Sequence, residues 1–282
     1  MYFRTDLALE MREAEKGKLD GVRVEEKRQG GALITIIEVE NETGEKVIGK
    51  PVGRYITIEL PPLTDNVPGE KEYLDAISEV LYALLPPVGP VLVCGLGNQD
   101  ITPDALGPQT ISRILATRHI IGEIERSAGL HGMRSVAALA PGVLGQTGME
   151  VAEILEGMVE HIKPVAVIVV DALASRRLSR LGCTVQIANS GISPGSGINN
   201  ARPSIDQKTL GVPVIAVGVP IVHKMQYMES LKIEGHSLTV KNKAGPPKGE
   251  KIWASHIDQG GATRYITTSK INNRNIYFLY EV

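Results

Sequence analysis

The sequence has few cysteines, no long hydrophobic run and no excess of either charge. Its two cysteines, Cys94 and Cys183, lie far apart without CxxC spacing, which excludes a disulfide scaffold and a cysteine zinc site. Apolar runs such as residues 165–170 are far shorter than the ~20 residues that span a bilayer, and the charged N-terminal stretch has no apolar signal segment. The 30 basic and 32 acidic residues argue against a general nucleic-acid binder. We therefore expect a cytoplasmic globular protein with no membrane partner.

Aromatic side chains are also scarce and unevenly placed. Only 8 Tyr, 2 Phe and 1 Trp occur in 282 residues, and none lies between Tyr82 and Tyr227. A core in that block must be built from Val, Ile, Leu, Ala and Met. Because most of the aromatic residues follow position 226, we expect residues 224–282 to form a different structural unit.

The first third of the chain predicts strands and one helix. Residues 32–40 and 53–60 are rich in β-branched residues and flank the turn-like stretch 41–45, which indicates an antiparallel ribbon. Residues 70–85 carry apolar side chains at helical spacing and stop before Pro86, as expected for a helix.

From residue 91 the pattern changes to short apolar runs separated by helical segments. Continuous Val and Ile runs are typical of parallel strands that helices cover on both faces. The runs are residues 91–96, 135–140, 165–170, 184–188 and 212–219, and the expected helices are 105–121, 146–162 and 172–181. We predict an α/β fold, an open, doubly wound and mostly parallel sheet over about 91–223, with a β-rich N-terminal extension over 30–62.

Reactive side chains follow several of these runs. In open α/β sheets the ligand site lies beyond the carboxyl ends of the strands, so these positions are the candidate site. They are Asp100 and Asp104 after the first run, Asp171 directly after 165–170, the glycine-rich loop 189–200, and His223 shortly after the last run.

Asp171 and Asp104 each allow two interpretations. Asp171 is either the N-cap of a helix over 172–181 or a site residue, and Asp104 is either a first-turn acid or a site residue. Asp100 looks more like a loop acid. Two carboxyl groups that converge can share a proton, because one pKa rises and the other falls. One then acts as a base towards water and the other as an acid towards a carbonyl oxygen, which suits peptide hydrolysis.

Several familiar motifs are absent. Asp100 stands where a GxGxxG fingerprint needs its third glycine, and the loop 191–197 lacks the GK[ST] of a phosphate-binding loop. HExxH does not occur, and most of the histidines are scattered along the chain.

Eight segments together resemble one known family, the germination proteases of endospore-forming bacteria. The resemblance covers roughly residues 1–222 in order. It is carried by RTDLALE (4–10), GRYITIE (53–59), GLGNQDITPDALGP (95–108), TRH (117–119), PGVLGQTG (141–148), DALASR (171–176), NSGISPGSG (189–197) and VPVIAVGVP (212–220).

The resemblance implies a cytoplasmic endopeptidase of the spore core that needs no cofactor. Such enzymes are made as inactive zymogens, assemble into tetramers and degrade small acid-soluble spore proteins. Their fold is similar to that of hydrogenase-maturation endopeptidases. The resemblance further implies that Asp104 and Asp171 are the catalytic acid pair.

The resemblance also implies a cleavage rule. Substrates of the family are cut after an acidic residue and before a hydrophobic one that is followed by Ala, which matches Asp6, Leu7 and Ala8. It therefore places self-cleavage between Asp6 and Leu7, with residues 1–6 as the propeptide and 7–223 as the peptidase domain. Arg176 is our candidate donor for the acidic side chain of the substrate; the alternative is a structural ion pair on its helix.

Beyond residue 222 the sequence departs from the family, whose members usually continue into a longer helical region. Residues 236–282 are polar and turn-rich and contain hints of short strands. Two alternatives therefore stay open. One is a metal-dependent, hydrogenase-maturation-like peptidase that uses Asp104, Asp171 and His223. The other is an inactive binding or assembly protein on the same scaffold.

Overall fold

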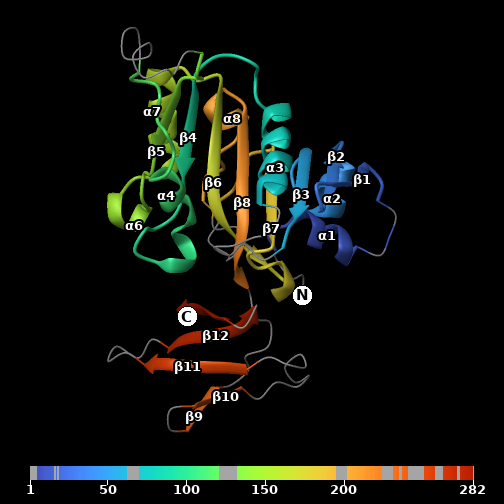
Figure 1. Ribbon diagram of the computed structural model, residues 1–282, viewed down its shortest axis with the longest axis vertical. Helices are drawn as coiled ribbons and strands as arrows, with labels where there is room; N and C mark the ends of the chain where they lie inside the picture. The colour runs from blue at the N-terminus through green and yellow to red at the C-terminus, as the bar shows by residue number, and fades with distance from the viewer. Residues whose placement is uncertain are drawn as a thin grey trace.

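One eight-stranded mixed sheet organises the first 223 residues of the computed structural model (Figure 1). The structure describes residues 5–15, 17, 19–61, 70–120, 132–194, 202–223, 231–234, 237–240, 251–257, 263–271 and 274–281. The strand order is β1-β2-β3-β7-β8-β6-β4-β5. The strands are β1 (Val22–Gln29), β2 (Ala32–Val39), β3 (Gly53–Glu59), β4 (Val91–Gly95), β5 (Val136–Leu139), β6 (Ala166–Ser175), β7 (Thr184–Ala188) and β8 (Val214–His223).

The predicted fold class is confirmed. β5, β4, β6 and β8 pair in parallel, and β1, β2 and β3 form an antiparallel extension. The expected ribbon of residues 32–40 and 53–60 is the β2–β3 pair.

The helices are α1 (Ala8–Ala14), α2 (Glu42–Ile48), α3 (Glu70–Leu84), α4 (Leu106–Ile111), α6 (Leu144–Thr147), α7 (Val151–Ile162) and α8 (Gln207–Leu210), with 3-10 turns η1 (Thr102–Asp104) and η2 (Leu178–Arg180).

Two expectations for the segment after residue 170 are wrong. No helix covers 172–181, because β6 continues to Ser175 and only the short η2 follows it. β7 is antiparallel to both of its neighbours, β3 and β8. The connection from β6 to β7 is shorter than the dozen or more residues that a crossover to a parallel strand requires.

The stretch 41–45, expected to be a turn, begins helix α2. The side chain of Asn41 caps this helix by accepting hydrogen bonds from the N–H groups of Thr43 and Gly44, and Gly49 ends it with a left-handed φ of 68°. Both residues are typical helix-end signals, an N-cap Asn and a C-terminal Gly.

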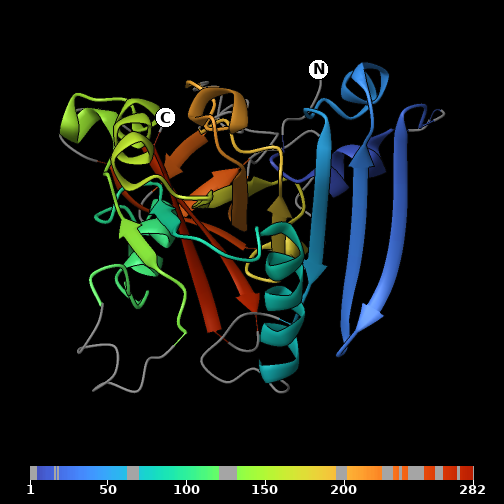
Figure 2. The same cartoon turned by 90° about the horizontal axis from the view of Figure 1, so that it is seen from above.

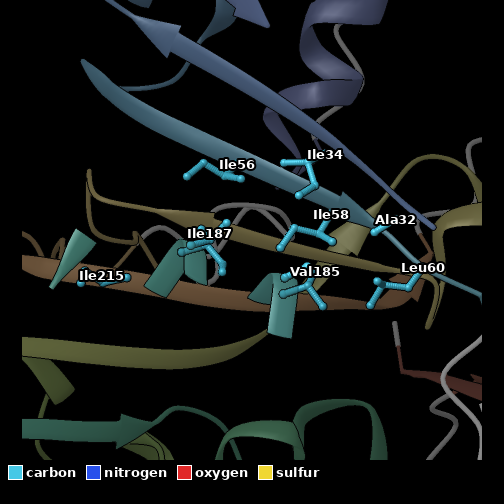
Figure 3. Packing of buried hydrophobic residues seen from close by; sticks show 10 residues of the cluster. Ala32, Ile34, Ile56, Ile58, Leu60, Val185, Ile187 and Ile215 are labelled. Atoms are coloured by element: carbon cyan, nitrogen blue, oxygen red, sulfur yellow. The ribbon is translucent and has the colours of Figure 1, made fainter. Parts of the chain in front are cut away.

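Helices cover both faces of the sheet. On one face α3 packs against apolar side chains of β2, β3, β7 and β8. Figure 2 shows the ribbon of α3 lying along the sheet, and Figure 3 shows the strand-side part of the cluster, with Ala32, Ile34, Ile56, Ile58, Leu60, Val185, Ile187 and Ile215 labelled. On the opposite face α1 and α2 cover Tyr55 and Ile37, and α7 packs on Leu92 and Val167 of the parallel strands. Among the described helices, none is long and apolar enough to cross a bilayer.

Beyond β8, the described residues form two further antiparallel sheets. They consist of β9 (Leu231–Glu234) with β10 (Ser237–Val240), and of β11 (Lys251–Ile257), β12 (Thr263–Ile271) and β13 (Arg274–Glu281). Both cysteines are free.

Helix α1 is held in place by a buried carboxylate. Glu10 is fully buried, and its two oxygens accept hydrogen bonds from the main-chain N–H groups of Arg176 (2.6 Å) and Arg177 (2.9 Å). Arg180, itself buried, lies 3.6 Å from the same carboxylate and 2.8 Å from Glu13. The start of the chain is thereby fixed to the segment that directly follows β6.

Replacing Glu10 by Ala should lower the free energy of unfolding by about 3 kcal/mol. The change leaves two buried N–H groups without an acceptor and removes one counter-charge from Arg180. Denaturant unfolding measures this difference. Glu26→Ala, which removes an exposed carboxylate on β1, is the matched control and should stay within about 0.5 kcal/mol of wild type.

Candidate active site

The candidate site lies where β6 extends past its neighbour β4. The last β4–β6 pair is Gly95 with Val170, whereas β6 continues for residues 171–175, paired with β8. We call residues 171–175 the β6 overhang. Asp171 is its first residue and pairs with Gly218, so it sits inside a strand and is not a helix N-cap. One of its carboxylate oxygens accepts a hydrogen bond from the N–H of Ala172 at 2.8 Å.

Asp104 reaches the same place from the loop that leaves β4. It ends η1, which packs against β6 and β8. Its Oδ2 accepts a hydrogen bond from the N–H of Asn98 at 2.7 Å. The loop needs glycine at position 97, which has a φ of +110° and where a Cβ would lie 2.0 Å from the carbonyl oxygen of Asp104. The structure therefore brings Asp104 and Asp171 together.

Burial raises both carboxyl pKa values. The pKa of Asp171 rises to about 8, first because the group is desolvated and then because the charge of Asp104 lies nearby. Burial also raises the pKa of Asp104, but the N–H of Asn98 and the charge of Arg202 counteract the increase. We expected one pKa to fall, and this was wrong because desolvation acts on both groups. The pair is still asymmetric, with Asp171 holding its proton at neutral pH.

Arg202 belongs to this site, although the sequence did not single it out. It influences Asp104 electrostatically and forms an ion pair with Glu150, with its Nη1 3.4 Å from Oε2. A nearby bridge between Ile192 and Ile205 ties the two ends of the glycine-rich loop together. In the sequence, the only signal that Arg202 belongs to the site was its position just after the glycine-rich loop. Residues 195–200 of the loop lie outside the described residues.

The N-terminal segment lies on the β6 overhang. The N–H of Asp6 donates to the carbonyl of Ala174 at 2.9 Å, and the carboxylate of Asp6 accepts from the N–H of Ala174 at 2.8 Å. The charge of Asp6 contributes to the raised pKa of Asp171. Leu7 and Ala8 are fully buried. The expected self-cleavage bond, Asp6–Leu7, thus lies next to Ala174 of the β6 overhang. Residues 1–4 lie outside the described part of the chain.

A second cation that the sequence did not suggest lies near Asp6. Lys50 directly follows the Gly49 that ends α2, and burial lowers its pKa while the charge of Asp6 opposes the shift. Arg176, the predicted donor, is half-buried, and its main-chain N–H binds Glu10. Among the described residues, no carboxylate lies within ion-pair distance of the Arg176 guanidinium.

The remaining candidates lie apart from the pair. Asp100 is exposed, and its N–H donates to the side chain of Asn98. His223 pairs with Ser175, four residues beyond Asp171 on β6, or about 13 Å at ~3.3 Å per residue. Within the described ranges, no group of three or more His, Cys, Asp or Glu side chains is arranged to hold a metal ion.

Comparisons with known proteins identify the family. The family description "Germination protease" (peptidase family A25) matches residues 4–234. This chain belongs to the germination protease family. It is 51% identical to a germination protease of Caldanaerobacter subterraneus over 223 residues, which are 78% of this chain and 68% of the relative. It is 47% identical to a germination protease of Clostridium tetani over 232 residues, 79% of this chain and 71% of the relative.

Among solved structures, the hydrogenase maturation protease HycI of Thermococcus kodakarensis aligns with half of this chain. The alignment covers 80% of HycI, with 20% sequence identity and a TM-score of 0.33.

The raised pKa of Asp171 predicts how stability depends on pH. An unfolded Asp has a pKa near 4, so the folded protein binds this proton more tightly, and stability should fall as the pH rises from about 4 to about 8. Asp171 alone should change the free energy of unfolding by at most about 1.4 kcal/mol per pH unit. Asp171→Asn should flatten the profile and be more stable than wild type at pH 8, as measured by denaturant unfolding. Asp100→Asn, at an exposed site, should follow wild type; a wild-type profile in Asp171→Asn would contradict the assignment.

Proposed function

We propose that this protein is an endopeptidase that uses Asp104 and Asp171 as an acid–base pair to start the degradation of small acid-soluble spore proteins during germination. Membership of the germination protease family supports peptidase activity. The proposal depends most on two half-buried carboxyl groups, Asp104 after β4 and Asp171 on β6, which lie near one another and have unequal proton affinities.

The unequal pKa values suggest the role of each carboxyl. Asp104, the group that ionises more readily, takes a proton from a water molecule whose oxygen attacks the carbonyl carbon of the scissile bond. Asp171, protonated below about pH 8, gives its proton to the carbonyl oxygen. When the tetrahedral intermediate collapses, the proton held by Asp104 passes to the leaving nitrogen, and the carboxyl product returns a proton to Asp171. No proton is gained or lost over the cycle.

We further propose that the chain is made as a zymogen and cleaves itself between Asp6 and Leu7, with residues 1–6 as the propeptide. The contacts of Asp6 with Ala174 on the β6 overhang, and its electrostatic influence on Asp171, support this cut. Substrates would carry an acidic residue before the scissile bond, a hydrophobic residue after it and then Ala, as Asp6, Leu7 and Ala8 do. We propose a homotetramer in the spore core, whose mass light scattering would measure.

Asp104→Asn and Asp171→Asn should each slow both self-cleavage and substrate cleavage by about 10²- to 10⁴-fold, because each removes one partner of the proton transfer. Mass spectrometry of the incubated chain and of an acid-soluble spore protein measures the two reactions. Asp100→Asn is the matched control and should keep wild-type rates, as should wild type treated with a chelator. Full activity of either pair variant would remove that residue from the mechanism, and loss of activity on chelation would favour the metal-dependent alternative with His223.

We propose that the guanidinium of Arg176 pairs with the acidic side chain of the substrate. If so, Arg176→Ala should reduce the preference for a Glu substrate over its Gln counterpart by about tenfold or more, since a charge-assisted hydrogen bond contributes about 1.5–3 kcal/mol. The ratio of kcat/KM for the two peptides measures this preference. Lys50→Met is the comparison variant, because Lys50 is the cation near Asp6. An unchanged ratio in Arg176→Ala together with a reduced ratio in Lys50→Met would assign the role to Lys50 instead.

A further inference from the structure

Gln186 is a buried amide in the middle of β7, between the apolar residues Val185 and Ile187. A buried amide that lacks hydrogen-bond partners is destabilising, so the groups that it binds indicate what the position is for. Its Nε2 donates to the carbonyl oxygen of Asp6 at 3.0 Å, and its Oε1 accepts from the N–H of Ala8 at 2.8 Å. The side chain of Gln186 therefore forms hydrogen bonds with the main chain of the N-terminal segment on both sides of Leu7, at Asp6 and at Ala8.

Sheet register places this amide on the same face as Asp171. Asp171 pairs with Gly218 of β8, and Gly218 pairs with Gln186 of β7, so the three residues form one row across the sheet. Directly paired residues project to the same face. The residue between the two polar side chains is a glycine, where a Cβ would lie 2.4 Å from the side chain of Leu173. The side chain of Leu173 therefore fills the space above this glycine. Asp6 contacts both β6, at Ala174, and the side chain of Gln186.

All of these contacts to Asp6 use groups that any acidic residue in an extended chain possesses. Its N–H binds the carbonyl of Ala174, its carboxylate accepts from the N–H of Ala174, and its carbonyl accepts from Nε2 of Gln186. The bond from Ala8 fixes which end of the Gln186 amide is the acceptor, so Nε2 faces the position of the Asp6 carbonyl. Removal of residues 1–6 leaves three hydrogen-bonding groups in place without these partners.

We infer that Ala174 and Gln186 form the subsite that binds the substrate residue before the scissile bond, with Nε2 of Gln186 donating to the carbonyl under attack. This inference rests on the proposed function. Asp6 occupies the subsite in the uncut chain, and the equivalent residue of a substrate occupies it afterwards. Because the carbonyl oxygen gains negative charge as water adds, the Nε2 hydrogen bond strengthens during the reaction, and the main effect falls on kcat.

Two substitutions of Gln186 test this role in the full-length chain. Gln186→Glu keeps an acceptor for the N–H of Ala8 but puts an oxygen where Nε2 donates, and Gln186→Met removes both hydrogen bonds with little change in size. Both should lower kcat about 100-fold for a peptide of the sequence Glu-Leu-Ala, and both should slow self-cleavage. Gln29→Met, which removes an exposed amide of β1, is the matched control and should match wild type.

A second measurement uses wild-type protein and so does not depend on the folding of a variant. N-methylation of the Glu residue in the peptide removes the N–H that would bind the carbonyl of Ala174, and it should raise KM about tenfold. A wild-type kcat in Gln186→Glu, or an unchanged KM for the methylated peptide, would overturn the subsite while leaving the proposed peptidase intact. Absence of cleavage by wild type itself would instead contradict the proposed function.

Discussion

β6 is ten residues long and β4 is five, so the second half of β6 runs past the strand that pairs with its first half. Main-chain N–H and C=O groups in a protein interior must find partners. In the β6 overhang, main-chain groups find two kinds of hydrogen-bond partner. The carboxylate of Asp171 accepts from the N–H of Ala172, and Asp6 of the N-terminal segment binds both the N–H and the carbonyl of Ala174. The unequal strand lengths therefore place a reactive carboxyl and a bound peptide segment side by side.

Two groups of charged side chains in the described residues, one beside the site and one within it, behave differently. Glu10 and Arg180 are buried as an ion pair, and main-chain N–H groups also bind the carboxylate of Glu10, which keeps α1 against the segment after β6. Asp104 and Asp171 are half-buried carboxyl groups whose charges influence one another, which favours a proton on Asp171. The first arrangement holds α1 in place, and the second raises the pKa of Asp171.

The sequence was sufficient for features that local pattern determines. Continuous apolar runs predicted the parallel strands, and the acids that follow them predicted Asp104 and Asp171, because strand ends meet at one edge of such a sheet. Helix α2 was missed although Asn41 and Gly49 carry its start and stop signals, since the turn-like composition between two strands was given more weight.

Other features depend on contacts between distant segments, which no local pattern contains. The direction of β7 and the length of β6 follow from a short connection whose residues had helical periodicity. Lys50 and Gln186 come near Asp6 only because α1 folds back over the sheet, and Arg202 reaches Asp104 only once the loop ends meet. Lys50 and Gln186 gave no signal in the linear sequence, and the only signal for Arg202 was its position after the glycine-rich loop.

The attachment of Asp6 to the rest of the chain has a kinetic consequence. A segment joined by a short linker competes for its own binding position at an effective concentration in the millimolar range, whatever the protein concentration. A separate polypeptide competes only at its actual concentration. While Asp6 remains connected to Leu7, a foreign chain would rarely displace it from Ala174 and Gln186. If the proposed cut occurs, the released peptide would become an ordinary dilute ligand. If the proposed cut occurs, covalent continuity alone would therefore make the uncut chain the less active form.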